Sequence, residues 1–187
     1  MLKKVCELSR KNGIPSFEGN KLHGNALKLF RSNQCVLLMT NSLKVERDGG
    51  ILRVAFNRPE RKNAIDNAMW IALKEIFLES REDDKVRCVL LTGVGEIFSA
   101  GVDLASFDQA SSDAQHPFES AARAVADFNK PLIAAVKGVA VGGGATILFH
   151  ADIVYVSKSL RMRLPFASLA LAPEWGSSYM LQANIGA

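Results

Sequence analysis

After residue 39, short apolar runs alternate along the chain with segments whose apolar residues recur at helical spacing. Three of these runs, Val86–Leu91, Leu132–Val136 and Ile153–Val156, have the length of a strand rather than that of a buried helix. Strands that alternate with helices are typical of sheets built through crossover connections. The alternation therefore predicts an α/β fold, in which the continuous apolar run Val86–Leu91 forms a strand buried on both faces.

A β-hairpin and a capped helix are predicted before that strand. The apolar-rich runs Ser42–Arg47 and Ile51–Asn57 flank Asp48-Gly49-Gly50, a sequence typical of hairpin turns. Asp66 then precedes a segment, about Asn67–Arg81, whose apolar residues follow helical spacing. Because an Asp carboxylate can accept from free N–H groups of a first helical turn, Asp66 is the predicted N-cap.

The second half of the chain predicts further elements with clear boundaries. The polar stretch Asp108–His116 precedes an amphipathic helix that runs to about Phe128. Pro131 ends that helix and opens the strand Leu132–Val136. The glycines that follow lead into an apolar helix that runs to about His150. Proline is common at the first helical position, so Pro173 is the predicted start of a final helix.

The net charge of +4 comes from the N-terminal segment. Residues 1–38 contain seven basic and two acidic side chains, whereas the remaining chain contains 16 basic and 17 acidic ones. A nucleic-acid footprint should lie on the folded domain, so this distribution argues against nucleic acid as a partner. We interpret residues 1–38 as a basic extension that need not belong to the fold, and residues 39–187 as the folded core.

The extension has several possible origins. Met39 could be the biological start, and residues 1–38 could be a leader, a mitochondrial presequence or translated upstream sequence. The two Glu, the preference for Lys and the several Asn of the segment weaken the presequence reading. Cytoplasm is the default location, with mitochondrion and peroxisome as alternatives.

Composition excludes other classes of protein. Hydrophobic residues make up 48% of the chain and charged residues 22%, values typical of a globular protein. No apolar run approaches the ~20 residues that span a bilayer, so no membrane partner is expected. The odd number of cysteines (Cys6, Cys35, Cys88) predicts reduced thiols, and the scattered histidines predict no metal site.

Two turns after predicted strands carry small residues. One is Phe98-Ser99-Ala100-Gly101-Val102-Asp103-Leu104, and the other contains Gly142-Gly143-Gly144 ahead of the apolar helix. Glycine lets the backbone approach a ligand closely, and a helix N-terminus offers free N–H groups. If the turns converge, one N–H from each would form an oxyanion hole. The alternatives are an ordinary turn with Asp103 as a cap, and close helix–sheet packing.

Four motifs in this order resemble the enoyl-CoA hydratase/isomerase, or crotonase, superfamily. The resemblance covers about residues 42–186, and its motifs are Asn57-Arg58-Pro59-Glu60-Arg61-Lys62-Asn63-Ala64, the Phe98–Leu104 turn, Gly142-Gly143-Gly144 and Ala151-Asp152-Ile153. It implies a crotonase-like spiral of ββα units. It also implies that the chain, which ends at Ala187, lacks the C-terminal helical segment through which family members form trimers or hexamers.

The resemblance also implies site residues. The N–H groups of Val102 and Gly143 would bind the carbonyl oxygen of a coenzyme A thioester, which is the substrate, so no separate cofactor is expected. The loop of Lys62, Asn63 and Ala64 would lie along the adenosine of coenzyme A. The other substrate contacts implied in the two turns are Ala100, Gly101, Asp103, Leu104 and Gly142.

The carboxylates favour one subclass. Hydratases of this superfamily use two Glu, at positions that Thr146 and Phe166 occupy here. A hydroxyl and a phenyl ring cannot replace those acids and bases. The segment Leu164–Ser178 instead resembles Δ3,Δ2-enoyl-CoA isomerases, which implies Glu174 as the base. Phe166, Leu169 and Trp175 would exclude water from it and raise its pKa.

The resulting prediction is an enzyme that isomerises 3-enoyl-CoA to 2-enoyl-CoA through a thioester dienolate in acyl-CoA catabolism. One alternative is an enoyl-CoA hydratase. A second is a non-catalytic acyl-CoA-binding or assembly module, which would keep the two turns but would not need Glu174. A homo-oligomer is expected where the C-terminal helices are present.

Overall fold

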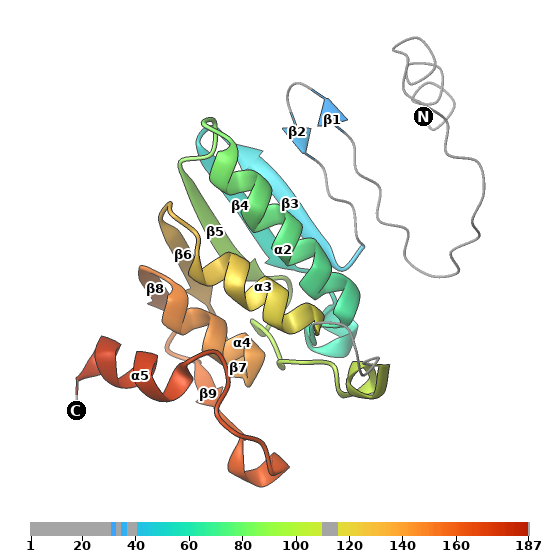
Figure 1. Cartoon of the computed structure of the whole chain (residues 1–187), viewed down its shortest axis with the longest axis vertical. Helices are drawn as coiled ribbons and strands as arrows, with labels where there is room; N and C mark the ends of the chain where they lie inside the picture. Colours follow the sequence, from blue (N-terminus) through green and yellow to red (C-terminus); the bar gives the residue numbers. More distant parts are fainter. Residues whose placement is uncertain (1–30, 33–34, 37–40, 110–115, 187) are drawn as a thin grey trace.

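The computed structural model describes residues 31–32, 35–36, 41–109 and 116–186. Its main feature is a five-stranded sheet in the order β3-β4-β5-β6-β8, with helices α2 and α3 on one face (Figure 1). β3 and β4 are antiparallel, and every other neighbouring pair in this sheet is parallel. The strands are β3 (Leu43–Asp48), β4 (Ile51–Phe56), β5 (Cys88–Gly93), β6 (Leu132–Val136) and β8 (Ile153–Val156). The predicted α/β fold is confirmed.

The predicted hairpin and capped helix are both present. β3 pairs with β4 through a turn at Gly49-Gly50, where Gly49 has the left-handed φ of +57°. Helix α2 spans Asn67–Glu82, and the Asp66 side chain accepts a hydrogen bond from the Met69 N–H at 2.9 Å. These elements form where local sequence alone indicates them.

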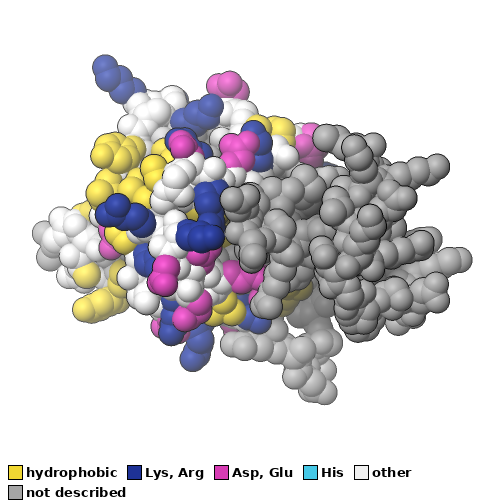
Figure 2. Space-filling view, turned by 90° about the horizontal axis from the view of Figure 1, so that it is seen from above, with side chains coloured by type: hydrophobic (Ala, Val, Ile, Leu, Met, Phe, Trp, Pro, Cys, Tyr) yellow, Lys and Arg dark blue, Asp and Glu magenta, His cyan; other side chains and the backbone are white. Residues whose placement is uncertain are grey.

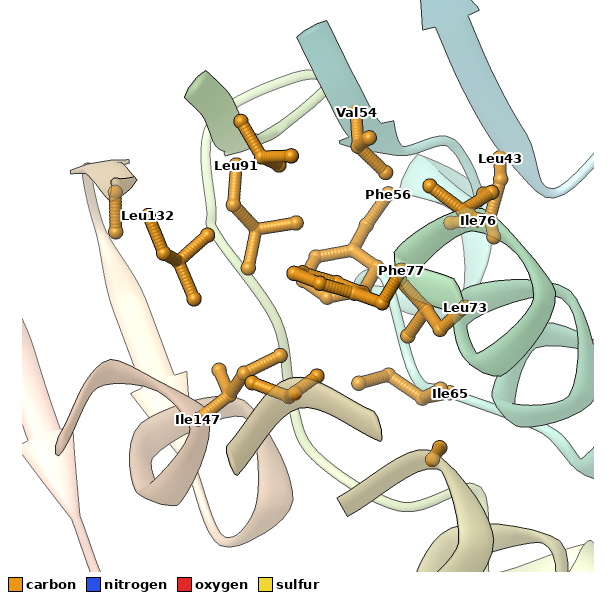
Figure 3. Packing of buried hydrophobic residues seen from close by; sticks show 14 of the residues in the cluster. Leu43, Val54, Phe56, Ile65, Leu73, Ile76, Phe77, Leu91, Leu132 and Ile147 are labelled. Carbon is orange, nitrogen blue, oxygen red and sulfur yellow. The ribbon is translucent and has the colours of Figure 1, made fainter. Parts of the chain in front are cut away.

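The core lies between the sheet and the helices. Phe56 of β4 and Leu91 of β5 point toward Leu73 and Phe77 of α2 (Figure 3), and all four side chains are at most 1% exposed. The apolar stripe of the helix therefore covers the inner face of the sheet, which is the main stabilising contact of an α/β layer.

The chain repeats a structural unit that does not show as a sequence repeat. After a strand of the main sheet, the chain adds a short strand or bridge to a second layer and then forms a helix. These units are β5, the Ser99–Ala140 bridge and α3 (Pro117–Ala126); β6, β7 (Val139–Val141) and α4 (Gly143–Thr146); and β8, β9 (Arg161–Arg163) and α5 (Ser177–Ile185). This is the predicted spiral of ββα units.

Two predictions about elements are wrong. The strand β5 begins two residues later than predicted, and it is buried on only one face: Val89 is fully buried, whereas Leu90 is partly exposed. Leu90 is partly exposed because no described helix covers the outer face of the sheet (Figure 1). The final helix begins at Ser177 rather than at Pro173, because Trp175 and Gly176 have left-handed φ angles of +52° and +63°. An α-helix cannot include such residues.

Other boundaries differ slightly from the predictions. Helix α3 ends at Ala126, and the apolar helix after the glycines continues from α4 as a 3-10 turn, Ile147–His150. Two further 3-10 turns are Pro59–Arg61 and Leu104–Gln109, and a third is Ala167–Leu169. Near the N-terminus, β1 (Arg31–Ser32) and β2 (Cys35–Val36) form a two-stranded pair. Met39 and residues 110–115 lie outside the described residues, as does most of the predicted extension.

The surface carries both signs of charge. On the face shown in Figure 2, basic and acidic side chains lie interspersed over the described part of the chain. Within the described ranges, no helix combines the length and apolar character needed to cross a membrane. Among the same residues, no cluster of three or more His, Cys, Asp or Glu side chains could hold a metal ion.

Candidate active site

The two glycine-bearing turns lie against each other. Gly101 has a φ of +91°, and a Cβ on it would lie 2.4 Å from the Val141 carbonyl oxygen. The Val141 N–H donates to the Ser99 carbonyl at 3.1 Å. A Cβ on Gly144 would likewise lie 2.7 Å from the Ser99 Cβ. Because atoms cannot approach this closely, the turns can meet only where these positions have no side chain.

Each turn leaves one backbone N–H free at the junction. Ile65 donates to the Gly101 carbonyl at 2.8 Å and accepts from the Asp103 N–H at 2.9 Å, so the Val102 N–H between them points away from Ile65. Gly143 is the first residue of α4, where an N–H has no partner within the helix. No described residue accepts a hydrogen bond from either N–H group.

Both N–H groups belong to residues that line one cavity of about 240 Å³. The cavity is mostly apolar, and Glu174 is the acidic side chain in its wall. The structure brings together eight of the predicted site residues there: Ala100, Gly101, Val102, Leu104, Gly142, Gly143, Phe166 and Glu174. Leu169, which was expected to exclude water from Glu174, also lines the cavity. Sequence reasoning missed three further lining residues, Val141, Pro165 and Leu171, whose apolar side chains gave no signal apart from their neighbours.

Glu174 lies in an environment suited to a base. Burial raises the pKa of its carboxyl group, and a hydrogen bond from Thr146 lowers it by a smaller amount. The Thr146 Oγ1 lies 3.4 Å from Glu174 Oε1, and Thr146 is fully buried. Thr146 thus contacts the candidate base, and it occupies the position at which the resemblance places a carboxylate in hydratases.

Trp175 does not line the cavity. Its ring packs edge-on against Phe118, with centroids 5.5 Å apart, and against Trp70 at 6.4 Å. The predicted contact of this ring with substrate therefore has no counterpart in the cavity wall. Sequence reasoning placed Trp175 there as a ring that excludes water from Glu174, but the backbone at Trp175 is left-handed and its side chain lies against α3.

The predicted coenzyme A loop also lies outside the cavity wall. Lys62 and Asn63 have left-handed φ angles of +54° and +53°. Lys62 is exposed, and its carbonyl accepts from the Ala100 N–H at 2.9 Å, which joins the loop to the first turn. Ala64 is partly buried and accepts a hydrogen bond from the Arg58 side chain at 2.8 Å.

The Asn63 side chain makes its hydrogen bonds inside the protein. It is fully buried, accepts from the Arg58 N–H and donates to the Val94 and Ile97 carbonyls, each at 2.9 Å. These contacts tie the loop to the segment that leads into the first turn. Asn63 is thus placed to support the site from within, whereas the resemblance implies a direct contact with coenzyme A.

Replacing Asn63 with Ala is expected to lower the free energy of unfolding by about 3 kcal/mol, because three partly buried backbone groups lose their partner. Each such loss should cost about 1 kcal/mol, the low end of the range for buried groups. Urea denaturation measures the change. Asn57→Ala is the matched control, since the Asn57 amide makes one exposed hydrogen bond, to Asn41, and its loss should cost under about 1 kcal/mol. An unchanged stability of Asn63→Ala with weaker coenzyme A binding would instead favour the direct contact.

Arg58 fixes the Asp103 side chain. Its Nη1 lies 3.1 Å from Asp103 Oδ2 and 3.1 Å from Asp66 Oδ2. Asp103 is therefore paired within the protein and does not line the cavity. Sequence reasoning had identified Asp66 only as a helix cap, and the pairing with a residue 45 positions away from Arg58 left no local signal.

The chain is similar in sequence and in structure to known proteins of one family. A sequence model of the enoyl-CoA hydratase/isomerase family matches residues 46–187. The 1,2-epoxyphenylacetyl-CoA isomerase of Escherichia coli K12 is 34% identical over 148 residues, which cover 73% of this chain and 55% of that protein. Enoyl-CoA delta isomerase 2 of Rattus norvegicus is 35% identical over 154 residues, which cover 79% of this chain and 39% of that protein.

A carnitinyl-CoA dehydratase of Salmonella enteritidis is 39% identical over 146 residues, covering 74% of this chain and 54% of that protein. The solved enoyl-CoA hydratase/isomerase of Pseudoalteromonas atlantica aligns with a TM-score of 0.74 at 37% identity, covering 78% of this chain and 59% of that one. The chain thus spans about half the length of the curated relatives it matches. With the matched family model and the crotonase fold of its structural neighbours, the chain belongs to the enoyl-CoA hydratase/isomerase family.

Proposed function

We propose that this protein isomerises a 3-enoyl-CoA to the conjugated 2-enoyl-CoA. The observation that carries the proposal is the shared cavity, in which one partly buried carboxylate and two free backbone N–H groups meet an apolar wall. A thioester enolate needs these groups and no more: a base for the C2 proton and donors for the developing oxyanion. Coenzyme A enters as part of the substrate.

The reaction needs a single base. The Glu174 carboxylate removes a proton from C2, and the electron pair of that C–H bond spreads into a dienolate. The N–H groups of Val102 and Gly143 stabilise the negative oxygen. In comparable sites, one such donor stabilises the transition state by about 3–4 kcal/mol. The Glu174 carboxyl group then returns the proton to C4, which leaves the double bond between C2 and C3.

Hydration is the second candidate, because a carnitinyl-CoA dehydratase is among the relatives. Hydration requires a held and activated water, and at the two positions of the hydratase carboxylates this chain has buried Thr146 and the cavity-lining Phe166. Neither side chain can take up or supply a proton at neutral pH. The apolar wall also disfavours a bound water, and this supports isomerisation over hydration.

Two substrates separate the candidates. Incubation with a 3-enoyl-CoA should increase the ultraviolet absorbance of the conjugated thioester, and incubation with a 2-enoyl-CoA should leave that absorbance unchanged. Loss of absorbance from the 2-enoyl-CoA would favour hydration. No change with either substrate, together with tight binding of an acyl-CoA, would favour the non-catalytic binding module.

Thr146→Val is expected to move the acidic limb of the pH–rate profile to higher pH. The Thr146 hydroxyl lowers the pKa of Glu174, so its removal leaves burial unopposed and the pKa rises further. A base acts only when deprotonated, and more alkaline solution is then needed to ionise it. On the plateau, kcat/KM should change less than about tenfold, the equivalent of one hydrogen bond. A limb that moves to lower pH would contradict the assigned contact.

A further inference from the structure

Trp175, which follows the candidate base, is held from two sides. Its ring stacks on the imidazole of His150, with centroids 4.9 Å apart and planes inclined by 28°. Its indole Nε1 donates to the Ala122 carbonyl of α3 at 3.1 Å. The His150 Nε2 lies 3.1 Å from the carbonyl oxygen of Trp175 itself. One histidine thus contacts both the ring and the backbone of the residue beside Glu174.

The direction of the His150 hydrogen bond follows from its partner. A carbonyl oxygen can only accept, so Nε2 carries the proton and donates. Burial lowers the pKa of His150, an effect that the bond to Trp175 partly opposes. The ring is therefore neutral near pH 7, with its proton on the nitrogen that meets the backbone.

The backbone at Trp175 is one that needs to be held. Its φ of +52° lies in the left-handed region, which costs a non-glycine residue about 1–2 kcal/mol. Gly176 follows with a φ of +63°. On the other side, the Glu174 carbonyl accepts from the Ser177 N–H at 2.9 Å. Strained backbone of this kind persists only where surrounding contacts fix it, and it clusters at functional sites.

We infer that His150 is a positioning residue, whose Nε2–H holds the Trp175 carbonyl and so keeps the strained turn that directs Glu174 into the cavity. The inference rests on the proposed function, because His150 acts through the proposed base. His150 does not line the cavity, so it is not placed to touch a substrate bound there. His150 makes two different contacts with Trp175, a hydrogen bond to its carbonyl and a stack on its ring, and these can be separated by mutation.

Two substitutions separate these contacts. His150→Phe keeps an aromatic ring against Trp175 but has no N–H, whereas His150→Gln keeps an N–H donor and loses the stack. We expect His150→Phe to lower kcat about tenfold with KM within twofold of wild type, because small misplacements of a reacting group reduce the rate and spare binding. His150→Gln should recover most of that loss. Equal kcat in His150→Phe and wild type would overturn the inference.

A second readout does not depend on turnover. Hydrogen exchange of the two indole N–H groups, followed by NMR, should be at least tenfold faster for Trp175 in His150→Phe and unchanged for buried Trp70. Unchanged Trp175 exchange would overturn the role of His150 whatever the activity. An inactive wild-type chain would instead overturn the proposed function, and faster Trp175 exchange in the variant would then still support the bond that holds Trp175.

Discussion

Glu174→Gln is expected to lower kcat for 3-enoyl-CoA isomerisation by about 10²–10⁴-fold, the range that positioned acid–base groups contribute. The amide preserves the size of the side chain and can still contact Thr146, but it cannot accept the C2 proton. Steady-state kinetics measures the loss. Binding of a saturated acyl-CoA should remain within about threefold of wild type, because the oxyanion donors and the apolar wall are unchanged.

Stability is the control for this variant. Burial raises the pKa of Glu174 above its value in the unfolded chain. Between these two pKa values, the unfolded state binds fewer protons than the folded state, so the free energy of unfolding falls as the pH rises. The ionised carboxylate therefore destabilises the fold at and above the raised pKa. Glu174→Gln should be at least as stable as wild type near pH 7, and that advantage should disappear in acid. A variant that lost activity by unfolding would instead be less stable than wild type near pH 7.

Gly101→Ala is expected to lower kcat by about 10²–10³-fold, the loss typical when one donor of an oxyanion hole is removed. The added Cβ would lie 2.4 Å from the Val141 carbonyl oxygen, so the two turns must separate. Separation moves the Val102 N–H away from the Gly143 N–H, so the two groups can no longer donate to the same oxygen at the same time. Kinetics with a 3-enoyl-CoA, beside urea denaturation, separates this effect from a general loss of stability.

Gly49→Ala provides the matched control. Gly49 also has a left-handed φ, of +57°, but a Cβ there would meet nothing within 4 Å, and the hairpin lies outside the cavity wall. This substitution should cost about 1–2 kcal/mol of stability through backbone strain and leave kcat unchanged. Equal activity loss in both variants would mean that strain, rather than separation of the turns, causes the effect.

Local sequence predicted those parts of the molecule that local physics decides. The Gly49-Gly50 turn and the Asp66 cap each depend on residues that lie a few positions apart in the sequence, and both features are present. The glycines of the two turns were also informative, because Gly101 is required by a close approach that other residues cannot make. A resemblance then supplied the choice of Glu174, since a Glu after a proline carries no specific signal on its own.

The remainder depends on contacts between distant segments. Nothing near Asn63 in the sequence indicates that its amide bonds Val94 and Ile97, more than 30 positions away. The start of the last helix was misplaced for a related reason: Trp175 adopts a left-handed backbone that tertiary contacts with His150 maintain. The outer face of β5 was predicted to be buried, because periodicity shows how apolar a strand is and not what covers it.

Hydrogen–deuterium exchange at C2 tests the central claim most directly. A 3-enoyl-CoA in deuterium oxide is followed by proton NMR with the wild-type chain and with Glu174→Gln. Our account predicts that the wild-type chain accelerates loss of the C2 proton signal together with formation of the conjugated product, and that the variant does neither. Exchange at the same rate in both proteins would contradict the assignment of Glu174 as the base that forms the enolate.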